Sequence, residues 1–119
     1  MATQKKSDLL VVTKAKELCA YIITVTQKSP KQFRFTFVSR LQNLALDVIE
    51  NIYFANEIFI DKGEEMNAEA RVSLQRRALT GLKLLTYIAE LAMAQQCILF
   101  KQYEQIAMMA TDCQRLLGA

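Results

Sequence analysis

The side chain most often used for general acid–base catalysis is missing from this sequence. The 119 residues include no histidine, which excludes histidine general acid–base catalysis, Ser–His and Cys–His nucleophile pairs and imidazole metal sites. Ferritin-like di-iron centres need Glu-x-x-His on two helices, so that enzyme class is excluded too. The three cysteines, Cys19, Cys97 and Cys113, lie too far apart in sequence for zinc-ligand or Cys-x-x-Cys redox spacing. We expect three reduced thiols that pack as small apolar groups.

The carboxylates do not form a recognisable catalytic pair. Asp47, Glu50 and Glu57 belong to one expected helix and Glu90 to the next, and Glu50 and Glu57 are one heptad apart. That spacing is ordinary for the charged face of a helix, and no glycine-rich phosphate loop accompanies it. We therefore expect a protein that is not an enzyme and that uses no metal or cofactor.

The basic side chains are better candidates for a binding site, because the net charge is +3. Considered singly, each is expected to be a solvated or ion-paired surface residue. Considered together, arginine forks and lysine charges can contact the phosphates of RNA or DNA, while no known base-reading motif is present. The predicted nucleic-acid-binding residues are Lys28, Lys31, Arg34, Arg40 and Lys101, expected at one end of the molecule, and Arg76, Arg77 and Lys83, expected midway along it.

Helices are predicted to position these residues. Apolar residues recur at alternating steps of three and four in four segments, which is the packing pattern of helical bundles. One proline and three glycines leave few turn signals for a strand-rich fold. We predict an all-α, antiparallel up-down-up-down four-helix bundle, a single domain over 1–119 with helices at about 8–28, 30–61, 67–97 and 100–117. The expected seams are Val11, Ala15, Leu18, Ile22 and Val25; Val38, Leu41, Ala45, Val48, Ile52, Ala55 and Phe59; Leu74, Ala78, Gly81, Leu85, Ile88 and Ala92; and Leu99, Tyr103, Ile106, Ala110, Cys113 and Leu117.

Capping signals mark two of the three connections between helices. Ser29, Pro30 and Gln32 predict an N-cap, a first-turn proline and a capping box at the start of the second helix. Gly63 is expected to stop that helix, and Asn67 to cap the third. The last boundary, between 97 and 101, carries no such signal and is placed by length alone.

Two helices carry more apolar residues than one seam uses. The additional rows are Phe37, Leu44, Leu46, Ile49, Tyr53 and Phe54 on the second helix, and Leu84, Tyr87, Leu91, Ala94 and Ile98 on the third. These rows either widen the core or are buried in a homo-oligomer, and we prefer the oligomer because exposed apolar rows promote association. Gly81 costs about 1 kcal/mol relative to Ala in mid-helix, so we expect two helices to approach closely there.

Hydropathy predicts no membrane span, because every apolar stretch of about eighteen residues is interrupted by charge. The polar segment 1–8 lacks the apolar region of a signal peptide. We therefore expect a cytoplasmic protein.

Several segments resemble a known group of helical-bundle proteins. Residues 9–18 (LLVVTKAKEL), together with Ser29-Pro30-Lys31 and Arg34-Phe35, resemble the four-helix-bundle proteins of 23S ribosomal RNA intervening sequences. The chain is more similar to a sister branch, the accessory variability determinant proteins of diversity-generating retroelements. The segments that carry this second similarity are 48–58 (VIENIYFANEI), 82–85 (LKLL), 101–106 (KQYEQI) and 112–119 (DCQRLLGA).

The resemblance implies a specific role. Proteins of the accessory branch form barrel-like homopentamers with a basic surface, bind nucleic acid and associate with a reverse transcriptase that copies template RNA with adenine-directed errors. The implied contact residues are Arg34, Arg40, Arg76, Arg77 and Lys83. Two alternatives stay open: a helical protein-interaction scaffold, and an intervening-sequence-type bundle without a reverse-transcriptase partner.

Overall fold

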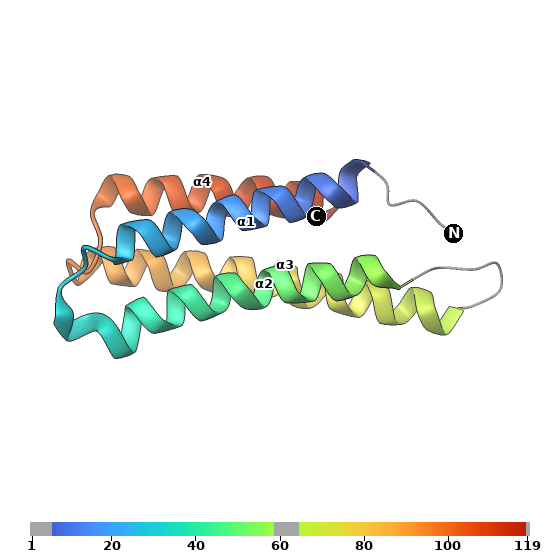
Figure 1. Ribbon diagram of the computed structural model, residues 1–119, viewed down its shortest axis with the longest axis horizontal. Coiled ribbons are helices and arrows are strands. Elements are labelled where there is room, and N and C mark those ends of the chain that lie inside the picture. The colour runs from blue at the N-terminus through green and yellow to red at the C-terminus, as the bar shows by residue number, and fades with distance from the viewer. Residues whose placement is uncertain (1–5, 59–64, 119) are drawn as a thin grey trace.

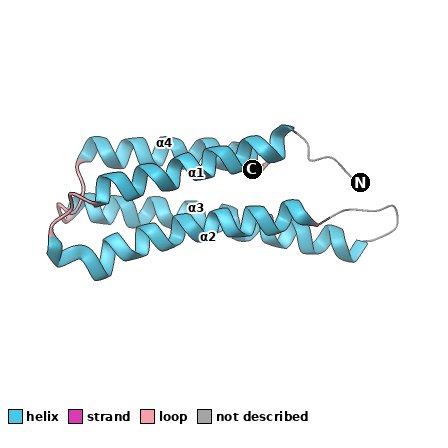
Figure 2. Ribbon diagram, viewed as in Figure 1, coloured by secondary structure: helices cyan, strands magenta, loops and turns pink. Residues whose placement is uncertain are grey.

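The protein is a bundle of four long helices, seen here in a computed structural model that describes residues 6–58 and 65–118. The helices are α1 (Lys6–Thr26), α2 (Ser39–Glu57), α3 (Glu65–Ala94) and α4 (Phe100–Leu116), and those described residues contain no strand. They lie side by side in a rod of 52 × 22 × 21 Å (Figure 1), and short loops join α1 to α2 and α3 to α4 (Figure 2). The prediction of an all-α four-helix fold is confirmed.

The core runs along the length of the bundle. Each helix packs against two neighbours, α1 and α3 both lying against α2 and α4. The expected seam of α1 is buried throughout, as is the seam of α2 from Leu41 to Ala55; Phe59 lies outside the described residues. The largest fully buried side chains are Leu18, Ile22, Leu41, Val48, Ile52, Leu82, Leu85, Ile106 and Cys113.

On α3 the buried seam differs from the predicted one. It consists of Ala78, Leu82, Leu85, Ala89 and Ala92, whereas Leu74, Gly81 and Ile88 are half-buried at its edge. Both series follow steps of three and four, and apolar residues occupy both, so periodicity alone does not distinguish them. On α4 the fully buried part of the predicted seam is Ile106, Ala110 and Cys113, with Tyr103 and Leu117 half-buried beside it, whereas Leu99 precedes the helix and is 68% exposed.

The connection from α1 to α2 does not use the predicted capping box. The Ser29 hydroxyl donates to the Cys97 carbonyl oxygen at 2.8 Å instead of capping the next helix. The chain then forms a 3-10 turn (Lys31–Phe33) and a π-helical turn (Arg34–Val38) before α2 begins at Ser39. The Ser29 hydroxyl thus satisfies a carbonyl in the α3–α4 turn and does not cap the helical turn that follows it.

The observed ends of α3 differ from the predicted ones, 67 and 97. Asn67 lies inside the helix, which already includes Glu65, so it is not the N-cap; the predicted stop at Gly63 lies outside the described residues. At the other end Gln96 adopts a left-handed φ of 66°. The Cys97 N–H donates to Ala92 O at 2.8 Å and the Gln96 N–H to Met93 O at 3.0 Å, which is a Schellman motif with glutamine in the usual glycine position.

A cluster of polar bonds ties three helices together at the opposite end. Arg71 of α3 pairs with the Asp8 carboxylate of α1 at 3.2 Å. Its other guanidinium nitrogen donates to the carbonyl oxygens of Ala55 and Ile58, both at 3.4 Å, at the end of α2. The Asn56 amide donates to the Asp8 carbonyl oxygen at 3.3 Å. Arg71 thereby supplies donors to carbonyls at the end of α2, where intrahelical donors run out.

None of the helices in the described part of the chain is long and apolar enough to cross a membrane.

Gly81 marks a close approach of α2 and α3, as predicted. A Cβ at position 81 would lie 3.2 Å from Cγ2 of Val48. We expect Gly81→Ala to leave the free energy of unfolding within about 0.5 kcal/mol of the parent, because the contact offsets the helix-propensity gain of about 1 kcal/mol.

In a Val48→Ala background the same substitution should raise the free energy of unfolding by about 1 kcal/mol, because the obstructing methyl group is gone. Urea unfolding of the four proteins of this double-mutant cycle measures the coupling. A full gain in the parent background would contradict the close approach.

Candidate nucleic-acid interface

Two turns bring basic residues together at one end of the bundle. Lys28 ends the turn after α1, and Lys31 and Arg34 lie in the short helical turns that lead into α2. Lys101 is the second residue of α4. The Ser29–Cys97 hydrogen bond holds the α1–α2 connection against the α3–α4 turn, and both turns lie at the same end (Figure 1). Arg40 follows in the first turn of α2.

This basic end carries the whole positive excess of the chain. Lys28, Lys31, Arg34, Arg40 and Lys101 fall in segments 18–46 and 91–103, which contain no Asp or Glu; the remaining sequence has ten basic residues against twelve acidic ones. All five side chains are exposed, and within the described ranges none forms an ion pair. The nearest carboxylate along the chain belongs to Glu104, three residues after Lys101. The potential here is therefore more positive than a net charge of +3 suggests.

The surface of the basic end is hollowed on two sides of Phe35. One hollow, of about 590 Å³, includes Lys31, Arg34, Gln42 and Asn43 in its lining. The other, of about 520 Å³, includes Arg40 and Ile88. Phe35 lines both and is 86% exposed. Sequence reasoning did not assign Phe35 to the site; its place between basic residues was the available signal.

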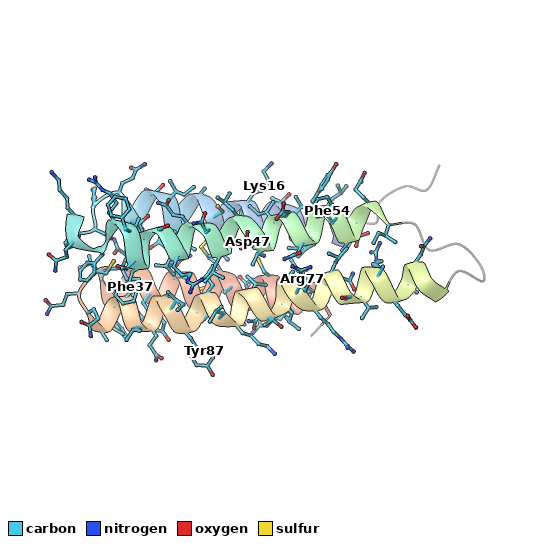
Figure 3. The ribbon with its side chains drawn as sticks, turned by 90° about the horizontal axis from the view of Figure 1, so that it is seen from below. Lys16, Phe37, Asp47, Phe54, Arg77 and Tyr87 are labelled. Atoms are coloured by element: carbon cyan, nitrogen blue, oxygen red, sulfur yellow. The ribbon has the colours of Figure 1, made fainter. Side chains whose placement is uncertain are left out.

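The three midway residues are not part of this end. Arg76 and Arg77 line a groove of about 830 Å³ between α2 and α3, which they share with Asp47 and Glu69. Figure 3 shows Asp47 and Arg77 along this helix pair. Lys83 is exposed one heptad beyond Arg76 and so lies on the same side of α3. The eight predicted residues therefore form two groups. The five residues of the basic end lie in segments without Asp or Glu, whereas the three midway residues lie among carboxylates.

Apolar side chains also remain on the outside of α2 and α3. Leu84, Tyr87 and Leu91 are 43%, 71% and 50% exposed, and Tyr87 points away from the bundle in Figure 3. On α2, Leu46, Tyr53 and Phe54 are each about half exposed. Of the additional rows, Ile98 is buried and Phe37, Leu44 and Ile49 are half-buried. The extra rows widen the core only in part.

The cysteine thiols and the four carboxylates considered above differ in their exposure to solvent. Cys19, Cys97 and Cys113 are buried, and burial raises the pKa of each thiol. Asp47, Glu50, Glu57 and Glu90 are exposed. Among the residues that the structure describes, no three Cys, Asp or Glu side chains are grouped closely enough to hold a metal ion.

No family model, curated protein or solved structure matches this chain.

Ionisation of the buried Cys113 thiol lowers the free energy of unfolding at alkaline pH. Burial, with a smaller contribution from the Asp112 charge, raises the pKa of Cys113 from 9.0 to about 11. Because the folded pKa is above the unfolded one, the stabilisation is complete below pH 9 and is lost as the pH rises toward 11. Between pH 8 and 11 we expect the parent to lose about 2 kcal/mol more unfolding free energy than Cys113→Ala, measured by urea unfolding. Parallel pH profiles for the two proteins would contradict this prediction.

Proposed function

We propose that this protein is a non-catalytic accessory subunit of a diversity-generating retroelement, which binds template RNA and the reverse transcriptase in the cytoplasm. One observation supports the nucleic-acid role most directly. The five basic residues of the basic end are exposed, form no ion pair in the described ranges and have no acidic residue in their own segments. Such a surface attracts a polyanion.

Binding would be directed at the phosphate backbone. Arginine offers a planar fork to phosphate oxygens, and lysine offers a mobile point charge. Each phosphate contact releases a condensed counterion, so the affinity should fall steeply with salt. The groove arginines Arg76 and Arg77 share their surface with Asp47 and Glu69, which weakens the local attraction for phosphate.

The proposal includes a homo-oligomer, with five subunits as the resemblance implies. The exposed row Leu84, Tyr87 and Leu91 on α3 supports subunit contacts, because burying such a row removes apolar surface from water. In a closed ring the basic ends of all subunits would act on one nucleic acid, which raises the effective affinity without any new contact. The association with a reverse transcriptase rests on the resemblance alone.

A second candidate is a helical protein-interaction scaffold. The groove between α2 and α3 favours it, since Leu44, Val72 and Leu84 line it beside Arg76, Arg77, Asp47 and Glu69. Apolar anchors with a charged rim suit the binding of an amphipathic helix. The scaffold differs from the accessory subunit in one measurable way, because it predicts negligible RNA affinity even at low salt.

Two matched charge reversals test the basic end. Arg34→Glu/Arg40→Glu and Arg76→Glu/Arg77→Glu change the net charge equally, from +3 to −1. We expect the first pair to weaken binding of single-stranded RNA at least about tenfold and to reduce the salt slope by about 1.4. The second pair should have a clearly smaller effect, because the groove already contains carboxylates. Fluorescence anisotropy over about 50–200 mM salt measures both quantities.

Lys16→Glu is the control for a general charge effect, since Lys16 lies on α1 outside both groups (Figure 3). A larger loss of RNA affinity for Arg76→Glu/Arg77→Glu than for Arg34→Glu/Arg40→Glu would place the interface on α3. An RNA affinity that is negligible for the parent would support the scaffold instead.

Light scattering tests the oligomer. We expect a mass near five times the chain mass of 13.6 kDa. Leu84→Glu/Leu91→Glu should shift the mass to a single chain while circular dichroism stays helical, because both side chains are 43–50% exposed and charges in a buried contact are costly. A parent mass of one chain at micromolar concentration would contradict the ring.

A further inference from the structure

Phe35 is held in an unfavourable position for a phenylalanine. Its side chain is 86% exposed, more than that of any other large apolar residue in the described part of the chain. Phe33 and Phe37, its neighbours two residues away, contact each other with ring centroids 5.6 Å apart and pack against the core. The exposed ring forgoes the stabilisation that burial would provide.

The backbone around Phe35 is irregular. The residue belongs to the π-helical turn Arg34–Val38, which directly follows a 3-10 turn. π-helical turns are rare and are frequently found at functional sites. Residues two positions apart in a helix lie about 200° apart around its axis, so Phe35 faces solvent while Phe33 and Phe37 pack against the core.

The surroundings of Phe35 combine an aromatic face with positive charge. Lys31 and Arg34 line the hollow on one side of the ring, and Arg40 lines the hollow on the other. Both hollows share Ser39 and Asn43, whose side chains provide polar groups beside the ring. An exposed aromatic ring flanked by cations is the combination that binds single strands, with bases stacked on the ring and phosphates held by the cations.

We propose that Phe35 stacks on an unpaired base of single-stranded nucleic acid, while Lys31, Arg34 and Arg40 contact the flanking phosphates. This inference rests on the proposed nucleic-acid function and specifies its ligand. Only an unpaired base offers a free face, because in a duplex both faces of a base are covered by its neighbours. A second copy of this chain is a poor occupant, since each copy would bring five more cations to the same surface.

The absence of tryptophan from the sequence permits a direct test. In Phe35→Trp the new indole is the single tryptophan and occupies the proposed stacking position. We expect its fluorescence to be quenched by an oligouridine of about twelve nucleotides and to change little with an RNA duplex of the same length. Met108→Trp is the matched control, because Met108 is 57% exposed on α4, outside the basic end and the exposed rows of α2 and α3, and its fluorescence should not respond to the oligouridine.

The affinities of Phe35→Leu for oligouridine and for the RNA duplex give a second test of base stacking. Leucine keeps the apolar character but removes the π-face, so oligouridine binding should weaken by about 5-fold or more. Duplex binding should change by less than about twofold, and Phe35→Tyr should retain the parent affinity for both probes. Urea unfolding should be unchanged, because the ring is exposed.

The outcomes separate this inference from the proposed function. If Arg34→Glu/Arg40→Glu loses oligouridine binding and Phe35→Leu does not, the stacking is wrong and the nucleic-acid role stands. If the parent binds neither probe, the proposed function itself fails. If Phe35→Leu weakens both probes equally, the preference for single strands is wrong. A blue shift of Phe35→Trp with phosphatidylserine vesicles, without a response to oligouridine, would assign the surface to an anionic membrane and overturn the inference.

Discussion

The hydrogen bond from the Ser29 hydroxyl to the Cys97 carbonyl oxygen joins two turns that are 68 residues apart in the sequence. It satisfies a carbonyl of the α3–α4 turn and holds the start of the irregular segment that leads into α2. The buried Thr26 ties the end of α1 to α2, since its hydroxyl accepts a bond from the Gln42 amide at 3.0 Å. The Ser29–Cys97 bond holds the two turns together, so cations from both connections share one end of the bundle despite their mutual repulsion.

Cations at the two ends of the molecule have different roles. Arg71 is four-fifths buried in its side chain and is committed to Asp8 and to the carbonyls at the end of α2. It stabilises the fold, and breaking such a partly buried pair would leave a charge without compensation. The lysines and arginines of the basic end are exposed and without ion pairs in the described ranges, so their charge remains available to a ligand. The same residue types therefore serve the structure at one end and are free to bind at the other.

The rod shape separates the surfaces that the proposal uses. The basic end is built by the turns, whereas the exposed apolar rows run along the sides of α2 and α3. Lateral association through the sides would leave the ends uncovered, so oligomerisation and phosphate binding do not compete. In such an assembly the π-helical turn with Phe35 would be repeated beside each cluster of cations, and a flexible single strand could engage several copies in turn.

Periodicity and glycine placement along single helices were enough to predict the helical class, the number of helices, most of the seams of α1 and α2 and the close approach at Gly81. The sequence also determined that segments 18–46 and 91–103 are basic without acids. Tertiary structure decided which of two equally periodic rows of α3 is buried, because the choice depends on where α2 and α4 lie. It also decided that the Ser29 hydroxyl donates to the carbonyl oxygen of Cys97, 68 residues away, and does not cap the helical turn that follows it. The left-handed φ of Gln96 also appears only in the folded chain, because local propensity favours glycine at such a position.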